Sequence, residues 1–430
     1  MQNKINVGLI GAGTVGGGTY KILKENFSEI SRKTGKDIVV FALAEKDIKR
    51  AEAVVDNKTK IYEDAFDLVR DKNIHIVVEL IGGTGISKDF VEEAIKNSKH
   101  IVTANKALIA MHGEELVSLA NHHNVNLCYE AAVAGGIPII KSIREGLAAN
   151  KIEWVAGILN GTTNYILTEM KENNLTFDVA LKQAQELGFA EADPTYDIEG
   201  VDAAHKLALL STLAFGTRVS FDDVYTEGIR HVSLQDIDYA EEFGYRIKLL
   251  GSARMTEHGL EQRVYPCMVT KTASIAHVES AYNAVVARCD FLDDTIYQGR
   301  GAGAGPTASA VVADIIDIAR GFATTTFGVP AGKLSAAEAA PIERHRGAYY
   351  VRLMVDDKPG VIADISGAFR DESVSIGSML QRARSQTEAV PIVLNTHVCE
   401  EAAMRRTLNR IEALDSVVEA PTMIRIESLV

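Results

Sequence analysis

Residues 187 to 206, LGFAEADPTYDIEGVDAAHK, combine a cluster of acids with a single amine, Lys206. Because residues four apart lie on the same face of a helix, Asp202 and Lys206 would be neighbours at the start of an apolar helix. On this pattern alone, a surface salt bridge is the simpler interpretation. A lysine whose pKa is lowered by burial or by a second cation can instead transfer a proton to or from a reacting hydroxyl group. In that alternative Asp202 orients Lys206, and Glu191 is free to bind a substrate ammonium group.

The first 130 residues alternate between strand and helix patterns, which predicts a parallel sheet covered by helices. The predicted strands are 5–10, 38–43, 74–81, 100–103 and 125–129, and the predicted helices include 88–97 and 107–122. We assign residues 1–134 to this α/β domain of the Rossmann class. A helical pattern at 308–322 follows the glycine-rich loop 299–309. It is expected to return to the first domain as a helix spanning about 305–327.

Three glycines, Gly11, Gly13 and Gly16, follow the first predicted strand in the pattern GxGxxG. Between a strand and a helix this pattern is typical of a dinucleotide-binding turn, because glycine permits the tight turn, the approach of pyrophosphate and close packing. The backbone of Thr14 and Val15, at the start of the helix, would donate to the phosphates. A merely structural glycine-rich turn is the alternative.

The end of the second predicted strand is the place where a dinucleotide-binding domain recognises the adenosine ribose. Glu45 stands there and could accept hydrogen bonds from free ribose hydroxyls, which favours NAD. Lys46, Lys49 and Arg50 follow and could pair with a 2′-phosphate, which favours NADP. The sequence leaves the choice between the two cofactors open.

Beyond residue 134 helices and strands are mixed, and we expect residues 135–304 to form an α+β catalytic and dimerisation domain. Its expected elements are helices at 137–149, 177–187 and 201–215 and strands at 151–159 and 263–269. A linker at 328–347 precedes a tail domain at 348–430. The tail has strand patterns at 349–355, 374–381, 389–399 and 423–429, with helix patterns at 361–372 and 400–414. This βαββαβ order is the ferredoxin-like arrangement.

The composition is that of an ordinary globular protein. The net charge is −13, whereas non-specific binding of nucleic acid needs a basic surface. No apolar run reaches the roughly 20 residues of a membrane span, and the N-terminal residues have no signal-peptide pattern. The four cysteines are scattered without a CxxC pair, which indicates buried thiols in a reducing cytoplasm. We therefore expect neither a nucleic-acid nor a membrane partner.

Several separated stretches closely resemble motifs of the homoserine dehydrogenase family. They are AQELGFAEADPTYDIEGVDAAHK at 184–206, VTANKALIA around Lys106, GILNGTTNYIL at 157–167 and the late GAGAGPTASAV loop. The motifs follow the family's order along essentially the whole chain, and the tail, with DDKPGVIADI, resembles an ACT regulatory domain. The resemblance implies the bacterial form without a fused aspartate kinase. It implies an NAD(P)-dependent oxidoreductase that interconverts L-aspartate 4-semialdehyde and L-homoserine in threonine, methionine and isoleucine biosynthesis.

This family chemistry implies roles for the amines and acids. Lys206 would donate a proton to the aldehyde oxygen, and Lys106 would reach toward nicotinamide and substrate. Two lysines in one closed site would lower each other's pKa. Glu191 and Asp202 would bind the substrate ammonium. The other expected site residues are Asp197, Asn160 and Thr162 near the substrate, and Gly188 and Gly303 near the cofactor.

Some of these residues have a simpler explanation in the sequence. Asn160 and Thr162 could equally serve as helix caps. Asp193 precedes a proline and is expected to start a turn. Glu199 is expected to be a solvated carboxylate without a catalytic role.

The stretch from Glu130 to Ile137 resembles the monovalent-cation loop of the family. One carboxylate, that of Glu130, together with the backbone carbonyls of Val133, Gly135 and Ile137 suits a hard cation such as sodium. A hinge between domains is the alternative, which the paired glycines would serve equally well.

The ACT-like tail implies regulation by an amino acid, with threonine the expected effector. Gly360, Val361 and Ile362 would present backbone groups to it. ACT modules commonly bind effectors at paired interfaces, so a homo-oligomer, a dimer or a tetramer, is expected.

Three other functions compete with this reading of the sequence. One is a dehydrogenase of a related small hydroxy amino acid. Another is a non-catalytic sensor of a dinucleotide and an amino acid, although a sensor would need neither Lys106 nor Lys206. The third, aspartate semialdehyde dehydrogenase, needs a cysteine nucleophile with a nearby base, and none of the four cysteines has such a setting.

Overall fold

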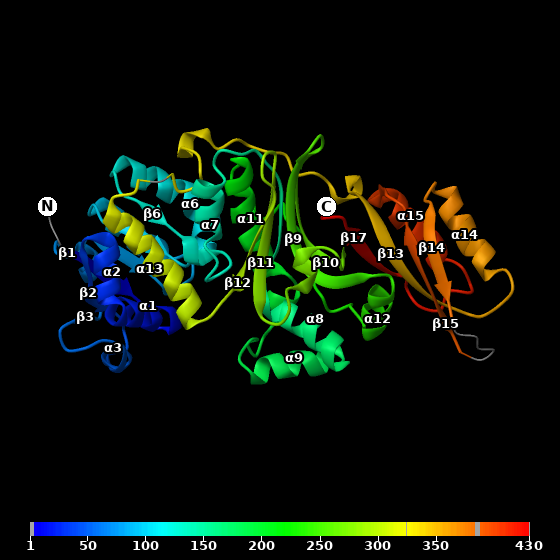
Figure 1. Cartoon of the computed structure of the whole chain (residues 1–430), viewed down its shortest axis with the longest axis horizontal. Helices are drawn as coiled ribbons and strands as arrows, with labels where there is room; N and C mark the ends of the chain where they lie inside the picture. The colour runs from blue at the N-terminus through cyan, green and yellow to red at the C-terminus, as the bar shows by residue number, and fades with distance from the viewer. Residues whose placement is uncertain (1–3, 324, 383–387, 430) are drawn as a thin grey trace.

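The chain is built on two β-sheets, and Figure 1 shows three lobes in a row, which we call the N-terminal, central and C-terminal lobes. The computed structural model describes residues 4–323, 325–382 and 388–429. Residues 1–3 of the expected first domain, residue 324 of the expected returning helix, and residues 383–387 and 430 of the expected tail domain lie outside the described residues.

The first sheet, in the N-terminal lobe, is parallel, with the order β3-β2-β1-β4-β5-β6. Its strands are β1 (Lys4–Ile10), β2 (Asp37–Ala44), β3 (Lys60–Tyr62), β4 (Ile76–Glu79), β5 (His100–Thr103) and β6 (Leu127–Cys128). This is the Rossmann order, whose switch point between β1 and β4 binds a dinucleotide. The predicted α/β Rossmann fold is therefore confirmed. The edge strand β3 was not predicted, because three residues give no alternating pattern.

Helices cover both faces of this sheet. On one face α1 (Thr14–Glu25) packs against α13 (Ala304–Arg320), which returns from far along the chain (Figure 1). Leu9 of β1 and Val311 of α13 share the apolar core on this face. The helix α13 ends earlier than the expected 305–327, because Gly321 takes a left-handed φ of 81° and stops it. The other helices of the lobe are α2 (Phe27–Thr34), α3 (Ile48–Val54), α4 (Ala65–Arg70), α5 (Ile86–Lys96) and α6 (Lys106–His122).

The second sheet runs through both remaining lobes in the order β12-β11-β7-β9-β10-β17-β13-β15-β14. Its central strands are β7 (Ile152–Ile158), β9 (Tyr245–Thr256), β10 (Gly259–Thr270), β11 (Tyr282–Cys289) and β12 (Asp293–Arg300), with β8 (Tyr225–Thr226) beside β10. Its C-terminal strands are β13 (Arg346–Val355), β14 (Ile376–Gln381), β15 (Val390–Thr396) and β17 (Thr422–Glu427), with β16 (Cys399–Glu400) beside β13. With α14 (Val361–Asp371) and α15 (Glu401–Glu412), the C-terminal lobe confirms the predicted ferredoxin-like βαββαβ order.

The central lobe carries the α+β mixture that the sequence predicts. Its longer helices are α8 (Gly161–Asn173), α9 (Phe177–Glu186), α11 (Val201–Phe215) and α12 (Leu234–Glu242), with the short α10 (Thr195–Ile198) before α11. The expected helix at 137–149 is wrong as a single α-helix. After α7 (Ile139–Lys141) the chain forms a π-helical turn at Ser142–Gly146, in which the Leu147 N–H donates to the Ser142 carbonyl. Such a one-residue bulge leaves no pattern in the sequence.

The sequence did not predict that the central and C-terminal lobes share one sheet. Strand β17 pairs in parallel with β10, with Arg425 opposite Cys267. The expected linker at 328–347 is also fixed to the central lobe, because the N–H of Leu260 donates to the Glu338 carbonyl and the N–H of Ala340 donates back to the Leu260 carbonyl. The C-terminal lobe is thus docked by the backbone and does not hang from a free tether.

Gly16 and Gly17 of α1 offer a matched pair of substitutions. A Cβ on Gly16 would lie 2.1 Å from the Gly11 carbonyl oxygen, whereas one on Gly17 would lie 3.8 Å from Val54. We expect Gly16→Ala to lower the free energy of unfolding of the N-terminal lobe by about 2 kcal/mol. Gly17→Ala should raise it by about 0.5–1 kcal/mol, because alanine is the better helix former. Denaturant unfolding measures both values, and equal stabilities of the two variants would contradict the packing of this turn.

Candidate active site

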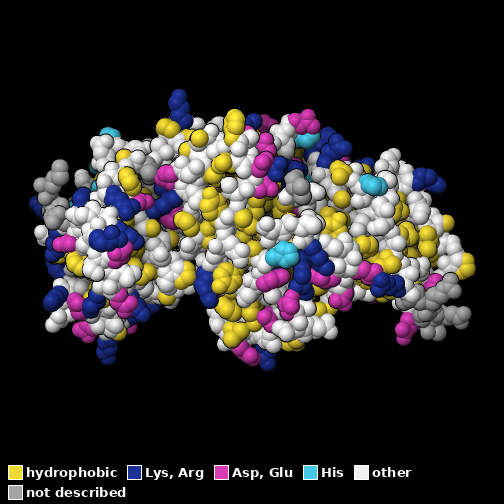
Figure 2. Space-filling view, viewed as in Figure 1, with side chains coloured by type: hydrophobic (Ala, Val, Ile, Leu, Met, Phe, Trp, Pro, Cys, Tyr) yellow, Lys and Arg dark blue, Asp and Glu magenta, His cyan; other side chains and the backbone are white. Residues whose placement is uncertain are grey.

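A cleft of about 730 Å³ lies between the N-terminal and central lobes. The starts of α6, α8, α11 and α13 line it. A helix N-terminus carries a partial positive charge, so four of them around one cleft favour the acidic side chains gathered there. On the face seen in Figure 2, by contrast, acidic and basic side chains are intermixed. The cleft brings together these residues singled out in the sequence: Lys106, Asn160, Thr162, Gly188, Glu191, Asp197, Asp202, Lys206 and Gly303.

Asp202 is the centre of charge in this cleft. Its Oδ2 lies 2.6 Å from Lys206 Nζ and its Oδ1 lies 3.2 Å from Lys106 Nζ, while only 9% of the side chain is exposed. Burial by itself would raise the pKa of Asp202, but the ammonium groups of Lys206 and Lys106 outweigh burial and lower it to about 2. The carboxylate is therefore ionised and joins an amine from each lobe. We expected the two lysines to act directly on each other. In the structure the negative charge of Asp202 lies between them.

Lys206 uses two of its three N–H groups inside the protein. Its Nζ donates to Asp202 Oδ2 and, at 2.8 Å, to the Leu159 carbonyl. The same carbonyl accepts a hydrogen bond of 2.9 Å from Nδ2 of the buried Asn283. Sequence reasoning missed Asn283, because it stands on a strand outside every motif. Within the described part of the chain the third N–H has no acceptor, so it is available to a ligand in the cleft.

Asn160 caps a helix, as one of its two expected roles required, and it also lines the cleft. Its Oδ1 accepts from the Thr163 N–H at 2.8 Å and so caps α8. Its Nδ2 donates to Asp197 at 2.7 Å and to Asp202 at 2.9 Å. Burial and the charge of Asp202 raise the pKa of Asp197, although the amide of Asn160 partly opposes them. One amide therefore holds two carboxylates at the floor of the cleft.

The aromatic ring of Tyr196 lies over Lys106, with 5.5 Å from Nζ to the ring centroid. Burial, followed by the charges of Asp202 and Asp197, raises the pKa of Tyr196 to about 12. The phenol thus stays neutral and its ring contacts the Lys106 cation.

A buried carboxylate fixes the backbone from which Lys106 projects. Glu79, which ends β4 and is fully buried, accepts from the Thr103 hydroxyl at 2.6 Å and from the N–H groups of Ile81 and Gly82. Thr103 in turn accepts from the N–H of Asn105, whose side chain caps α6 directly before Lys106. Sequence reasoning missed Glu79. The sequence pattern that could have revealed it is an acid at the end of an otherwise apolar strand.

The remaining acids of the 187–206 stretch have different surroundings, and only Asp193 takes the place in a turn that the sequence predicted. Glu191 lines the cleft with an exposed side chain, for which the described residues provide no ion pair. Asp193 accepts from the Thr195 N–H at 3.1 Å and starts a turn. Glu199 pairs with Arg230 at the surface. The Thr162 hydroxyl donates to the Phe189 carbonyl at 2.7 Å and so ties α8 to the loop that carries Glu191.

The glycine-rich turn lies at the start of α1, where Gly13 is the N-cap and Thr14 and Val15 are the first helical residues. Glu45 follows β2 and accepts from the Ala12 N–H at 3.0 Å and the Asp47 N–H at 3.3 Å. The guanidinium of Arg50 lies beside the same turn, since a Cβ on Gly13 would be 3.4 Å from one of its nitrogens. An acid and a base therefore both stand where a ribose and its substituents would bind.

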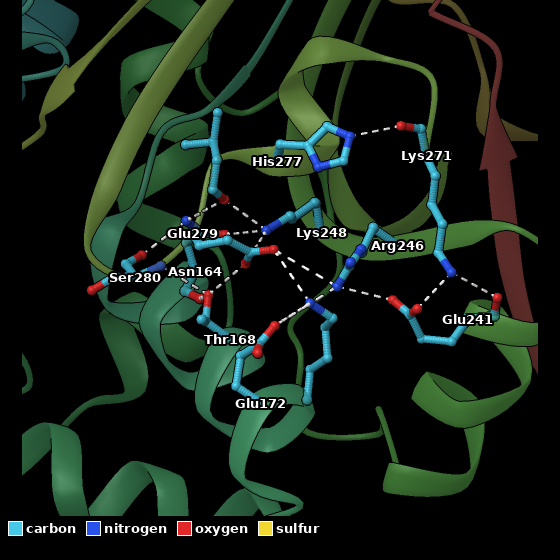
Figure 3. A network of polar contacts seen from close by, with 12 residues as sticks. Asn164, Thr168, Glu172, Glu241, Arg246, Lys248, Lys271, His277, Glu279 and Ser280 are labelled. Atoms are coloured by element: carbon cyan, nitrogen blue, oxygen red, sulfur yellow. Dashed lines mark hydrogen bonds and ion pairs between the residues drawn. The ribbon is translucent and has the colours of Figure 1, made fainter.

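A second polar network holds the segment that precedes Asn283 (Figure 3). The buried Lys248 Nζ donates to the Val278 carbonyl at 2.7 Å, to Glu279 at 3.0 Å and to Asn164 at 3.2 Å. Nδ2 of Asn164, on α8, donates to the carbonyls of Val278, Ser280 and Tyr282. These bonds hold the 278–282 segment that leads directly to Asn283. The network therefore helps to fix Asn283, the residue that shares the Leu159 carbonyl with Lys206.

Glu130 is buried, and backbone groups engage both of its carboxylate oxygens. The N–H groups of Ile140 and Lys141 donate to them at 2.9 Å each. Burial, followed by the charge of Asp314, raises the pKa of Glu130 to about 7. The carboxylate expected to bind a cation therefore caps the start of α7 in this structure.

The loop after Glu130 contains two consecutive left-handed residues, Ala134 with a φ of 54° and Gly135 with a φ of 53°. A Cβ on Gly135 would lie 2.2 Å from the Gly301 carbonyl oxygen, so the loop packs closely on the glycine-rich strand end.

Among the described residues, no group of three or more His, Cys, Asp and Glu side chains could hold a metal ion. In the same part of the chain, no helix is long and apolar enough to cross a membrane.

A second cleft, of about 800 Å³, lies at the start of α14 in the C-terminal lobe. Gly360 takes a left-handed φ of 99° as the N-cap of this helix. Val361 and Ile362 line the cleft together with the Asp356–Pro359 loop. The three residues expected to bind an effector thus lie in one concave site.

Three family models match the chain: the NAD binding domain of homoserine dehydrogenase at 11–130, homoserine dehydrogenase at 138–316 and the ACT domain at 349–416. A homoserine dehydrogenase of Neisseria gonorrhoeae is 47% identical over 99% of both chains. The crystal structure of a homoserine dehydrogenase from Thiobacillus denitrificans is 48% identical, has a TM-score of 0.92 and covers 99% of both chains. A hyperthermophilic archaeal homoserine dehydrogenase in complex with NADPH is 26% identical, has a TM-score of 0.64, and covers 75% of this chain and 99% of its own.

Replacing Glu79 tests the support beneath Lys106. In Glu79→Leu the Thr103 hydroxyl and the N–H groups of Ile81 and Gly82 lose their buried acceptor, so the free energy of unfolding should fall by about 2–4 kcal/mol. Glu199→Gln, which alters only a surface ion pair, should change it by less than about 0.5 kcal/mol. Thermal and denaturant unfolding of both variants provides the measurement. Wild-type stability in Glu79→Leu would show that the network does not hold the start of α6.

Proposed function

The chain belongs to the homoserine dehydrogenase family, and we propose that its reaction takes place in the cleft around Asp202. It is an NAD(P)-dependent oxidoreductase that interconverts L-aspartate 4-semialdehyde and L-homoserine in the biosynthesis of threonine, methionine and isoleucine. The non-catalytic sensor and the other two dehydrogenases considered above are thereby set aside. The observation that carries the assignment of the site is the convergence of Lys106 and Lys206, from two lobes, on one carboxylate.

We assign proton transfer to Lys206. In the direction of reduction its third N–H donates to the aldehyde oxygen, and in the direction of oxidation its amine accepts the hydroxyl proton. The bound nicotinamide cofactor supplies or accepts the hydride. Lys106 stabilises negative charge on the reacting oxygen. Asp202, ionised and buried between them, holds the two ammonium groups in place.

The substrate also carries an ammonium group, and we assign its binding to Glu191 first. The Asp202 oxygens already contact two lysines and an amide, whereas the Glu191 carboxylate is exposed at the mouth of the cleft. Asp202 remains the second candidate for this contact. Asp197, Asn160 and Thr162 would shape the floor beneath the substrate.

The dinucleotide would be held by the turn from Gly11 to Gly16, with donors from Thr14 and Val15 at the start of α1. Glu45 would face the adenosine ribose, and Arg50 beside Gly13 suits a 2′-phosphate. We therefore propose NADP as the preferred cofactor and NAD as an alternative one. Gly188 and Gly303, whose left-handed backbones line the cleft, together with Lys106 would border the nicotinamide end.

For the cation we propose sodium held by the backbone carbonyls of Val133, Gly135 and Ile137. The loop suits this role because it is folded tightly and buried between two lobes. Glu130 would support the ion by holding the fold of the loop around it, because its oxygens accept hydrogen bonds from two backbone N–H groups. A bound ion would brace the same loop that the sequence analysis considered as a hinge.

We propose threonine as the effector of the ACT domain, bound in the cleft lined by Gly360, Val361 and Ile362. A homo-oligomer, formed through the 135–304 domain, is proposed with it. The domain limits proposed for the chain are 1–134, 135–304, 328–347 for the linker and 348–430. The four free cysteines fit the proposed location in a reducing cytoplasm.

Lys206→Ala tests the assignment of the site. Loss of the proton donor should lower kcat for homoserine oxidation by about 10²–10⁴-fold, whereas cofactor affinity, measured by fluorescence titration, should stay within about twofold because the dinucleotide site lies on the other lobe. Lys182→Ala removes an exposed lysine of α9 and serves as the matched control with wild-type turnover. A near-normal kcat in Lys206→Ala would refute the proposed role.

Arg50→Gln tests the cofactor assignment. Loss of a charge-assisted contact to the 2′-phosphate should raise KM for NADP about tenfold and leave KM for NAD nearly unchanged. Glu52→Gln removes an exposed charge from the same helix and is the matched control. Steady-state rates with homoserine and each cofactor, with and without threonine, give these constants. An unchanged KM for NADP would mean that another group reads the 2′-phosphate.

A further inference from the structure

Among the ionic contacts that fasten the C-terminal lobe to the central lobe, two are made by largely buried arginines. In one, Asp236 of α12 accepts from Arg352 Nε at 2.8 Å and from the Tyr350 hydroxyl at 3.1 Å. In the other, Arg425 of β17 donates to Glu227 at 2.8 Å and to Glu401 at 2.8 Å. The two contacts look alike, but they reach different parts of the central lobe.

Arg425 is built into the interior of the central lobe. It is 1% exposed, and its guanidinium lies 4.4 Å from the ring centroid of Tyr265 and 5.4 Å from that of Tyr225. Its strand adds to the edge of β10, which places Arg425 opposite Cys267. A charge buried in this way depends on its partners, since an uncompensated buried charge is strongly destabilising. Glu227 is the partner that belongs to the central lobe.

Glu227 belongs to a segment that packs on the turn before α11. The Glu227 N–H donates to the Val264 carbonyl at 2.7 Å, and the Ile229 N–H donates to the Ile198 carbonyl at 2.9 Å. Between them, a Cβ on Gly228 would lie 2.4 Å from that same Ile198 carbonyl oxygen. The segment 227–229 and residue 198 therefore touch backbone to backbone, without flexible side chains between them.

The turn at 198–200 leads directly into the proposed site. Gly200, with a left-handed φ of 81°, is the N-cap of α11, and a Cβ on it would lie 3.0 Å from Thr226. Asp197 stands immediately before the turn, and Asp202 stands in the first turn of α11. A shift of the 227–229 segment would therefore move both carboxylates that Asn160 holds.

We propose that Arg425, acting through Glu227, is a positioning residue that sets the Asp197–Asp202 turn for catalysis. The last strand of the chain is then part of the framework of the active site, in addition to belonging to the regulatory domain. This inference rests on the proposed roles of Asp202 and Lys206. Arg352 provides the contrast. It also docks the C-terminal lobe, but its partner Asp236 lies on α12, away from the cleft.

The test compares Arg425→Met with Arg352→Met in the full-length enzyme. Arg425→Met should lower kcat/KM for homoserine by about 10–100-fold, because small displacements of reacting groups cost that much, while KM for NADP stays within about twofold. Arg352→Met should lower the unfolding temperature by a similar amount and keep kcat/KM for homoserine within about threefold. Similar losses of kcat/KM in both variants, or none in Arg425→Met, would overturn the proposal.

Glu227→Gln keeps the proposal testable if Arg425→Met does not fold. It preserves the shape of the side chain and removes the charge that Arg425 binds, so a fall in kcat/KM of at least about threefold supports the proposal. Wild-type kcat/KM in Glu227→Gln overturns it. Combining Glu227→Gln with Arg425→Met should cost less than the product of the two single effects, because both act through one contact. Failure of the wild-type enzyme to oxidise homoserine would instead refute the proposed function.

Discussion

The site depends on one buried carboxylate held between two ammonium groups that come from different lobes. Burial opposes the charge of Asp202, and the ammonium groups of Lys206 and Lys106 outweigh burial and lower its pKa. Likewise, the two ammonium groups can be held close to each other only because the carboxylate lies between them. The attraction between these three charges therefore favours one position of the N-terminal lobe relative to the central lobe. Any opening of the cleft that separates Lys106 from Asp202 either exposes a charge to solvent or leaves it buried without its partner.

The surroundings of this triad are organised to keep it in one geometry. Asn160 fixes Asp202 and Asp197 from one side, and the Leu159 carbonyl fixes Lys206 from another. Behind these groups lie polar networks with few exposed members, including the one around Lys248 (Figure 3). Buried hydrogen bonds of this type restrain the groups they join, because each group loses a hydrogen bond if it moves. The proposed proton transfer needs such rigidity, since it depends on heavy-atom distances of hydrogen-bond length.

Much of this arrangement could be predicted from local patterns. Alternating apolar runs gave the Rossmann sheet, and the spacing of Asp202 and Lys206 gave their contact, because both features are set by residues close in sequence. Asn283 was missed because its partner Leu159 is 124 residues away, and the bond from Thr103 to Glu79 was missed because it spans 24 residues. No motif marks either residue. The shared sheet was missed for the same reason, since the pairing of β17 with β10 joins residues far apart along the chain. The resemblance to a known family named the chemistry, but not these supports.

The parallel pairing of β10 with β17 also has a consequence for how the protein is made. The edge of β10 that β17 covers stays open until residues 422–427, which lie far beyond β10 along the chain, have been synthesised. Until then the nascent chain presents an uncovered strand edge, of the kind that recruits other strands and promotes aggregation. A variant without β17 would expose the edge of β10 to other strands even though the strands of the central lobe itself are all present.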